Sequence, residues 1–84
     1  MIIYLIFSQQ GFDEAKESIL ADNATLWVNA DFLSEQQISE LSQAKINVQI
    51  FPELVNGSNE KSILSALKPI EEHAPKAEIL IEYL

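Results

Sequence analysis

The chain has 84 residues, enough for one small domain, and its 48% hydrophobic and 21% charged residues are typical of a folded protein rather than a disordered one. Five Lys and no Arg against thirteen Asp and Glu give a net charge of −8, which disfavours nucleic acids and anionic membranes as partners. The chain contains no Cys, which excludes disulfides, thiolate catalysis and zinc–sulfur sites.

Residues 2–7 form a continuous apolar run rich in β-branched and aromatic side chains. This pattern predicts a strand that is buried on both faces, as in a parallel sheet. The run is too short to span a bilayer, and no basic segment precedes it as in a signal peptide. We therefore expect a cytoplasmic protein.

A helix is predicted next, because Phe12, Ala15 and Ile19 follow the break at residues 8–11 with helical spacing. After a turn at residues 22–23, residues 25–28 predict a second strand.

The second helix has the clearest local signature in the chain. Ser34 and Gln37 have the spacing of a capping box, in which each side chain accepts a hydrogen bond from the other residue's backbone N–H. Leu33 and Ile38 occupy the two hydrophobic positions around that cap, and Ile38 and Leu41 are expected to face the core.

Residues 46–51 alternate between apolar and polar, which predicts a strand well covered on one face only. Ser58 is the expected N-cap of a third helix that extends to residue 74. Pro69 lies inside that helix and is expected to kink it, because it has no N–H to donate to the Ser65 carbonyl.

Residues 77–84 alternate again and predict a final strand. Its two predicted faces are Ile79, Ile81 and Tyr83 on one side and Glu78, Leu80 and Glu82 on the other.

The predicted fold is a single α/β domain over residues 1–84, with a mostly parallel four-stranded sheet between helices on both faces. We expect the spatial strand order 2-1-3-4, with the first helix on one face and the second and third on the other. Strands three and four would then be half-exposed, which agrees with their alternating pattern. An antiparallel last strand is the alternative.

In such a sheet, ligands bind beyond the carboxyl ends of the strands. The candidate ligand-binding residues at this edge are Ser8, Gln9, Gln10, Asn29, Asp31, Glu53 and Asn56. Asp31 and Glu53 are the only candidates for a Mg²⁺ site. The alternative is that these residues only form turns and helix caps. Gly11 stands alone, without the other glycines of a dinucleotide-binding or phosphate-binding loop.

No catalytic residues are predicted. A Ser8–His73 pair would suit a hydrolase, but the third helix runs away from the edge that holds Ser8, so we expect His73 at the opposite end of the sheet. Trp27 is interpreted as a core residue, with an exposed interface anchor as the alternative.

Two functional hypotheses follow. The first is a non-enzymatic binding or regulatory module that acts through protein–protein contact, with a protein partner or a second copy of the chain and no cofactor. The alternative is a small-anion or Mg²⁺-dependent ligand site, possessing weak enzymatic activity, at the carboxyl edge of the sheet.

Overall fold

The computed structural model describes residues 1–82 as four strands and three helices in strict alternation. The elements are β1 (Ile2–Ile6), α1 (Gln9–Asp22), β2 (Thr25–Val28), α2 (Glu35–Gln43), β3 (Val48–Ile50), α3 (Glu60–His73) and β4 (Glu78–Ile81). The predicted fold class and element order are confirmed. Tyr83 and Leu84, which the sequence assigned to the last strand, lie outside the described residues.

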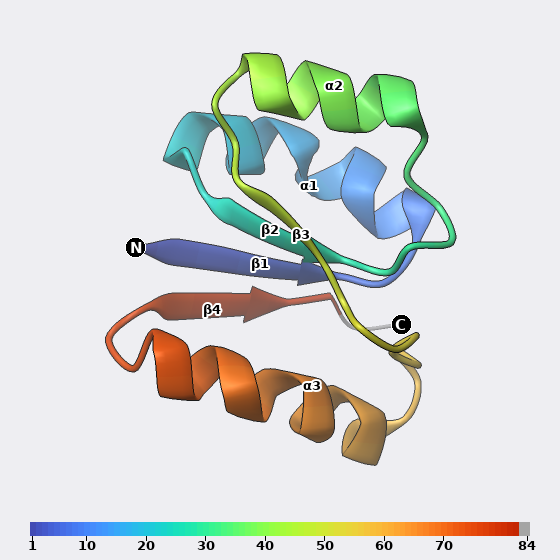
Figure 1. Ribbon diagram of the computed structural model, residues 1–84, viewed down its shortest axis with the longest axis vertical. Coiled ribbons are helices and arrows are strands. Elements are labelled where there is room, and N and C mark those ends of the chain that lie inside the picture. Colours follow the sequence, from blue (N-terminus) through green and yellow to red (C-terminus); the bar gives the residue numbers. More distant parts are fainter. Residues whose placement is uncertain (83–84) are drawn as a thin grey trace.

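The four strands form one sheet in the order β3-β2-β1-β4, and every neighbouring pair is parallel (Figure 1). The alternative of an antiparallel last strand is therefore wrong. The predicted order 2-1-3-4 is also wrong, because β3 pairs with β2 and β4 takes the free side of β1. Consecutive parallel strands usually become neighbours, and this preference decides the position of β3.

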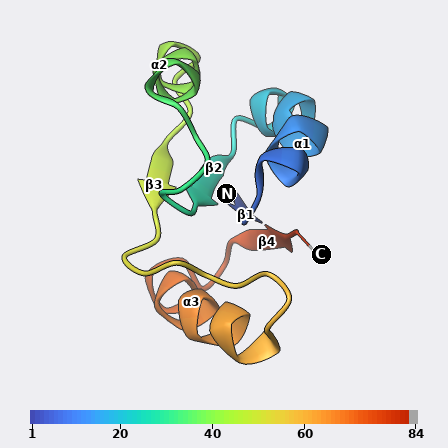
Figure 2. The same cartoon turned by 90° about the vertical axis from the view of Figure 1, so that its right-hand side faces the viewer.

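The helices are divided two to one between the faces of the sheet. α1 and α2 cover one face, here called the upper face, and α3 covers the lower face (Figures 1 and 2). The prediction that the second and third helices share a face is therefore wrong. The chain takes two successive steps outward from β1 to β3 over the same face, and then crosses beneath the sheet to reach β4.

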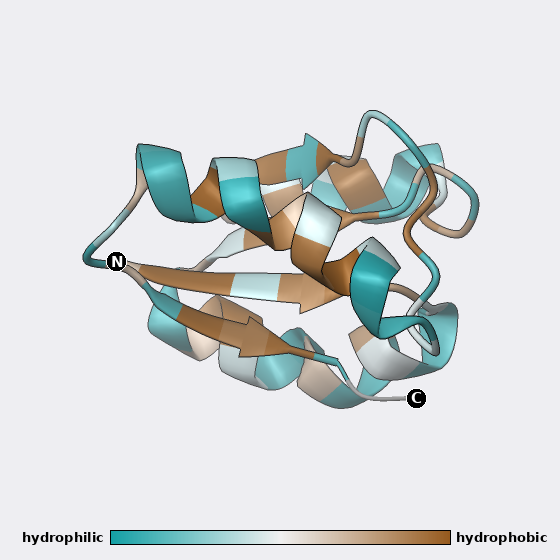
Figure 3. Ribbon diagram, turned by 90° about the horizontal axis from the view of Figure 1, so that it is seen from below, coloured by the Kyte–Doolittle hydropathy of each residue, from teal (hydrophilic) through white to brown (hydrophobic). Residues whose placement is uncertain are grey.

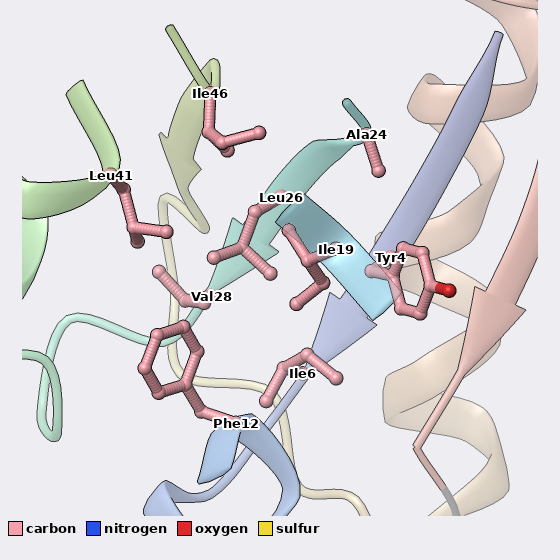
Figure 4. Packing of buried hydrophobic residues seen from close by; sticks show 9 residues of the cluster. All are labelled: Tyr4, Ile6, Phe12, Ile19, Ala24, Leu26, Val28, Leu41 and Ile46. Atoms are coloured by element: carbon pink, nitrogen blue, oxygen red, sulfur yellow. The ribbon is translucent and has the colours of Figure 1, made fainter. Parts of the chain in front are cut away.

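The upper core joins α1 and α2 to the sheet (Figure 4). Phe12 and Ile19 of α1 and Leu41 of α2 are essentially inaccessible to solvent. The cluster as a whole comprises Tyr4, Ile6, Phe12, Ile19, Ala24, Leu26, Val28, Leu41 and Ile46. Leu41 packs in the same cluster as the α1 residues, and this shared core keeps the two helices on one face.

The lower core lies between α3 and the centre of the sheet, and consists of Ile3, Leu5, Phe7, Phe51, Val55 and Ile70. β1 contributes to both cores, as its continuous apolar sequence predicted, and Figure 3 shows β1 and β4 as mostly hydrophobic strands. No helix in the described part of the chain is long and apolar enough to cross a membrane.

The helices begin at capping side chains. The capping box of Ser34 and Gln37 is confirmed, with both reciprocal hydrogen bonds present. Asn59, rather than the predicted Ser58, caps α3, because its side chain accepts from the N–H groups of Lys61 and Ser62. α3 continues through Pro69 to His73, and the kink expected at Pro69 stays a prediction.

Candidate binding site

The carboxyl edge of the sheet, where the sequence placed a ligand site, is occupied by a side chain of the protein itself. One carboxylate oxygen of Glu82 accepts from the N–H groups of Phe7 and Ser8, at 2.7 and 3.1 Å. The other accepts from the Ser8 hydroxyl at 2.6 Å. Ser8 is also the N-cap of α1, so the carboxylate lies where a helix start attracts negative charge.

Gly11 makes this arrangement possible. A Cβ atom at this position would fall on the Glu82 carboxyl group, so any larger residue forces that group to move. The Gly11 N–H donates to the Ser8 hydroxyl oxygen at 3.1 Å, which completes the cap of α1. Gly11 therefore permits the close approach of Glu82 to the start of α1.

Asn29 is the one buried polar residue in the described part of the chain, with 3% of its surface exposed. Its amide nitrogen donates to the Val55 and Phe7 carbonyls at 2.9 and 3.3 Å, and its oxygen accepts from the Val55 N–H at 2.8 Å. The side chain thus joins the ends of β1 and β2 to the loop that crosses beneath the sheet. These bonds use both N–H donors of the amide and one of the two acceptor positions of its oxygen, which holds the loop to the sheet.

Within residues 1–82, the side chains of the other candidate residues at this edge form no hydrogen bond with one another; those that bond do so with near neighbours in the chain. Gln9 and Gln10 donate to Asp13 and Glu14 one turn further along α1. The Asn56 side chain accepts from the Ser58 N–H within its own turn. Asp31 and Glu53 are exposed, and residues 1–82 contain no group of three or more His, Cys, Asp or Glu able to hold a metal.

The structure separates Ser8 from His73. Ser8 follows the carboxyl end of β1, whereas His73 is the last residue of α3 and precedes the start of β4. β1 and β4 are parallel, so the two residues lie at opposite ends of the sheet, as predicted. The Ser8 hydroxyl donates to Glu82 instead.

A concave feature lies on the lower face, where α3 leaves β2 and β3 uncovered. This groove, here called the α3 groove, has a volume of about 820 Å³ and runs between α3 and the two strands. Trp27 and Phe51 lie along it, with their ring centroids 5.6 Å apart. Thr25, Asn47 and Gln49 line the sheet side, which explains the polar alternation of β3.

The helix wall of the α3 groove extends over four turns. Its residues recur in pairs at positions 61–62, 65–66, 69–70 and 73–74. Pro69 in this wall has no N–H, so the Ser65 carbonyl receives no hydrogen bond from residue 69. Ser62 and Ser65 also line this wall, and the Ser62 hydroxyl accepts from the Asn56 N–H at 3.0 Å.

Sequence reasoning left strands three and four half-exposed but placed β3 beside β1, so it missed the groove that β2, β3 and α3 form together. The signal was present in Asn47 and Gln49, whose side chains mark the lower face of β3 as open. Trp27, interpreted as a core residue, is half-buried and lines the groove while packing against the lower core.

Tyr4 of β1 belongs to the upper core, on the side of the sheet opposite the α3 groove. Its hydroxyl donates to Asp22 at 3.0 Å. Burial raises the pKa of Tyr4 above its ordinary value of 10.0, and the hydrogen bond to Asp22 and the negative charges of Asp22 and Glu78 raise it further. The folded protein therefore holds this proton more tightly than the unfolded chain.

This shift predicts a loss of stability in alkali. The contribution is fully present below about pH 10, the unfolded pKa of tyrosine, and is lost as the pH rises through the folded value. Urea unfolding between pH 8 and 11 should show a steeper fall for the wild type than for Tyr4→Phe. Parallel curves for the two proteins would rule the shift out.

Comparison with known proteins gives no relative: no protein-family model, curated protein or solved structure matches the chain.

Proposed function

We propose that the protein is a small, non-enzymatic binding module that acts through protein–protein contact, and that the α3 groove receives one helix of the partner. The observation that supports the proposal is the uncovered lower face of β2 and β3 beside the full length of α3. Parallel sheets are normally covered by helices on both faces, so a helix is the element that this half-face lacks.

The shape of the groove suits a helix. The lining residues of α3 span positions 61–74, which at 1.5 Å per residue is about 20 Å of helix length. An occupant of this length would have about four turns, and would lie beside α3 as neighbouring helices do in α/β proteins. Recognition of an amphipathic helix in an apolar groove is a common mode of protein binding.

The chemistry of the groove defines the docking face of the partner. Trp27 and Phe51 offer aromatic surface to apolar side chains of the partner helix. Gln49 on the sheet side and Ser62 and Ser65 on the helix side can hydrogen-bond to polar residues at its margins. Lys61 and Glu53 bring one charge of each sign, so the docking face should be close to neutral.

The test is a selection from a displayed library of four-turn helices whose docking face is varied. We expect binders with apolar docking faces, and we expect them to change the fluorescence of Trp27, the only tryptophan of the chain. Gln49→Arg places a large charged side chain in the groove from an exposed position, and should weaken binding at least tenfold.

Gln36→Arg is the matched control, because Gln36 is exposed on α2, which covers the opposite face of the sheet. Its affinity for the same helices should stay within twofold of wild type. Helices that bind Gln49→Arg and Gln36→Arg equally well would contradict the proposal. A stable dimer with Trp27 shielded would contradict it too, because the occupant would then be a second copy of the chain.

A further inference from the structure

The upper face of β4 is a second uncovered part of the sheet. α1 lies over β1 on this side (Figure 2), and Leu80 of β4 is 39% exposed. A hollow of about 270 Å³ lies between α1 and β4, above Tyr4, Ile6 and Leu80. The base of the hollow is apolar, and β4 beside it is an edge strand of the sheet. The hollow can therefore receive apolar side chains of a partner.

Two acidic residues line this hollow, and two more lie near its Tyr4 side. Glu14 of α1 and Glu82 line it, and Glu78 shares the upper face of β4 with Leu80. Asp22, at the end of α1, accepts the hydrogen bond of the Tyr4 hydroxyl at 3.0 Å. The single salt bridge among residues 1–82 joins Lys16 to Glu40 elsewhere, so no described lysine pairs with Glu14, Asp22 or Glu78. The Glu82 carboxylate is already held by Phe7 and Ser8.

The spacing of these acids distinguishes between kinds of cation. No three of the described acidic or histidine side chains converge closely enough to hold a metal ion. Glu14 and Asp22 are eight residues apart on α1, a separation of about 12 Å. Separate cationic groups at that spacing match the carboxylates, as Lys or Arg residues two turns apart on a helix would.

We propose that the upper face of β4 binds a basic amphipathic helix of a partner protein. The helix lies beside α1 and parallel to its axis, and its apolar side chains enter the hollow above Leu80. Its Lys or Arg residues, spaced by seven or eight positions, face Glu14 at one end and Asp22 and Glu78 at the other. The interaction does not depend on the α3 groove, which lies on the opposite face of the sheet.

The probe is a fluorescent 18-residue helical peptide with Lys at this spacing and Leu between the lysines on the same face. A scrambled peptide of equal composition, in which Lys and Leu do not share a face, is its control. In anisotropy titrations at low salt we expect the patterned peptide to bind at least tenfold more tightly than the scrambled one. Binding should weaken as salt screens the exposed charges.

The matched variants are Glu14→Gln with Glu78→Gln, and Glu71→Gln with Glu72→Gln on α3. All four residues are exposed, and each pair lowers the magnitude of the net charge of −8 by two. The first pair should weaken binding about fivefold or more, and the second by less than twofold. Leu80→Lys should abolish binding, because it fills the hollow with a positive charge.

Equal effects of the two pairs would overturn the proposal, because they would mean attraction by net charge alone. Equal binding of the two peptides would overturn it as well. Gln49→Arg should leave this peptide's affinity unchanged, so failure here is distinguishable from failure of the α3 groove as a docking site.

Discussion

Replacement of Asn29 by Ala is expected to lower the free energy of unfolding by about 3 kcal/mol or more, since each buried polar group left without a partner costs about 1–3 kcal/mol. The substitution removes three hydrogen bonds and leaves the Val55 N–H and the Phe7 and Val55 carbonyls without their partner. A domain of 84 residues has a total stability of only about 4–13 kcal/mol, so the loss is a large fraction of it.

Urea denaturation followed by circular dichroism measures this effect. Asn47→Ala is the matched control, because Asn47 is exposed and its side chain only accepts from the exposed Gln49 side chain. The control should stay within about 0.5 kcal/mol of wild type, as surface substitutions usually do. If Asn29→Ala were equally mild, Asn29 would not hold the crossing loop to the sheet.

Asn29→Asp is a sharper probe of the same site. At neutral pH the carboxylate would face the carbonyl oxygens of Phe7 and Val55, to which the native amide donates. A buried carboxylate beside two acceptors has its pKa raised above the unfolded value of about 3.9, so the variant should recover stability as the pH falls toward 4. A deficit that stays constant with pH would argue against these contacts.

Gly11→Ala is expected to change the sign of its effect when Glu82 is removed. In the wild type, the new Cβ displaces the Glu82 carboxyl group from Phe7 and Ser8, and we expect a loss of about 2 kcal/mol, since hydrogen bonds to charged groups contribute about 1.5–3 kcal/mol. In a Glu82→Ala background nothing is displaced. There Ala should stabilise α1 by about 0.5–1 kcal/mol, because it is a better helix former than Gly.

A double-mutant cycle measures this coupling, with the four proteins compared by urea denaturation. Gly11 has no positive φ, so its backbone accepts Ala without strain and the effect reports on Glu82 alone. Glu78→Ala is the control partner, because Glu78 lies at an exposed position on β4, the strand that precedes Glu82. Additive effects of Gly11→Ala and Glu82→Ala would show that the carboxylate is not held at the α1 cap.

Local patterns predicted the elements of this fold well, and the sheet order less well. The apolar run of β1 and the capping box of Ser34 depend on near neighbours, so they can be recognised from short segments. The order of the strands depends on which face α2 covers. The predicted order 2-1-3-4 placed β3 inside the sheet with one face half-exposed, whereas the observed order places β3 at an edge with its lower face open. The polar alternation of Asn47 and Gln49 therefore agreed with either order.

The sequence placed Ser8 and Asn29 at the correct edge of the sheet, but it did not predict that the protein's own Glu82 and Val55 would bind them. Ser8 and Asn29 do lie at the carboxyl edge of the sheet, because the ends of parallel strands meet there. Their partners, Glu82 and Val55, are 74 and 26 residues away in the chain, and no local pattern reveals such contacts. The α3 groove was not predicted, because its walls come from elements that the observed strand order brings together and the predicted order does not.

The most direct test of the central claim, that the α3 groove is a docking surface, is an NMR footprint of a selected four-turn helix on the ¹⁵N-labelled protein. The account predicts that the shifted signals belong to the Trp27 indole, β2, β3 and the groove-lining residues of α3, while α1 and α2 stay unchanged. A footprint centred on α1 and α2, or an unperturbed Trp27 indole at saturation, would contradict it.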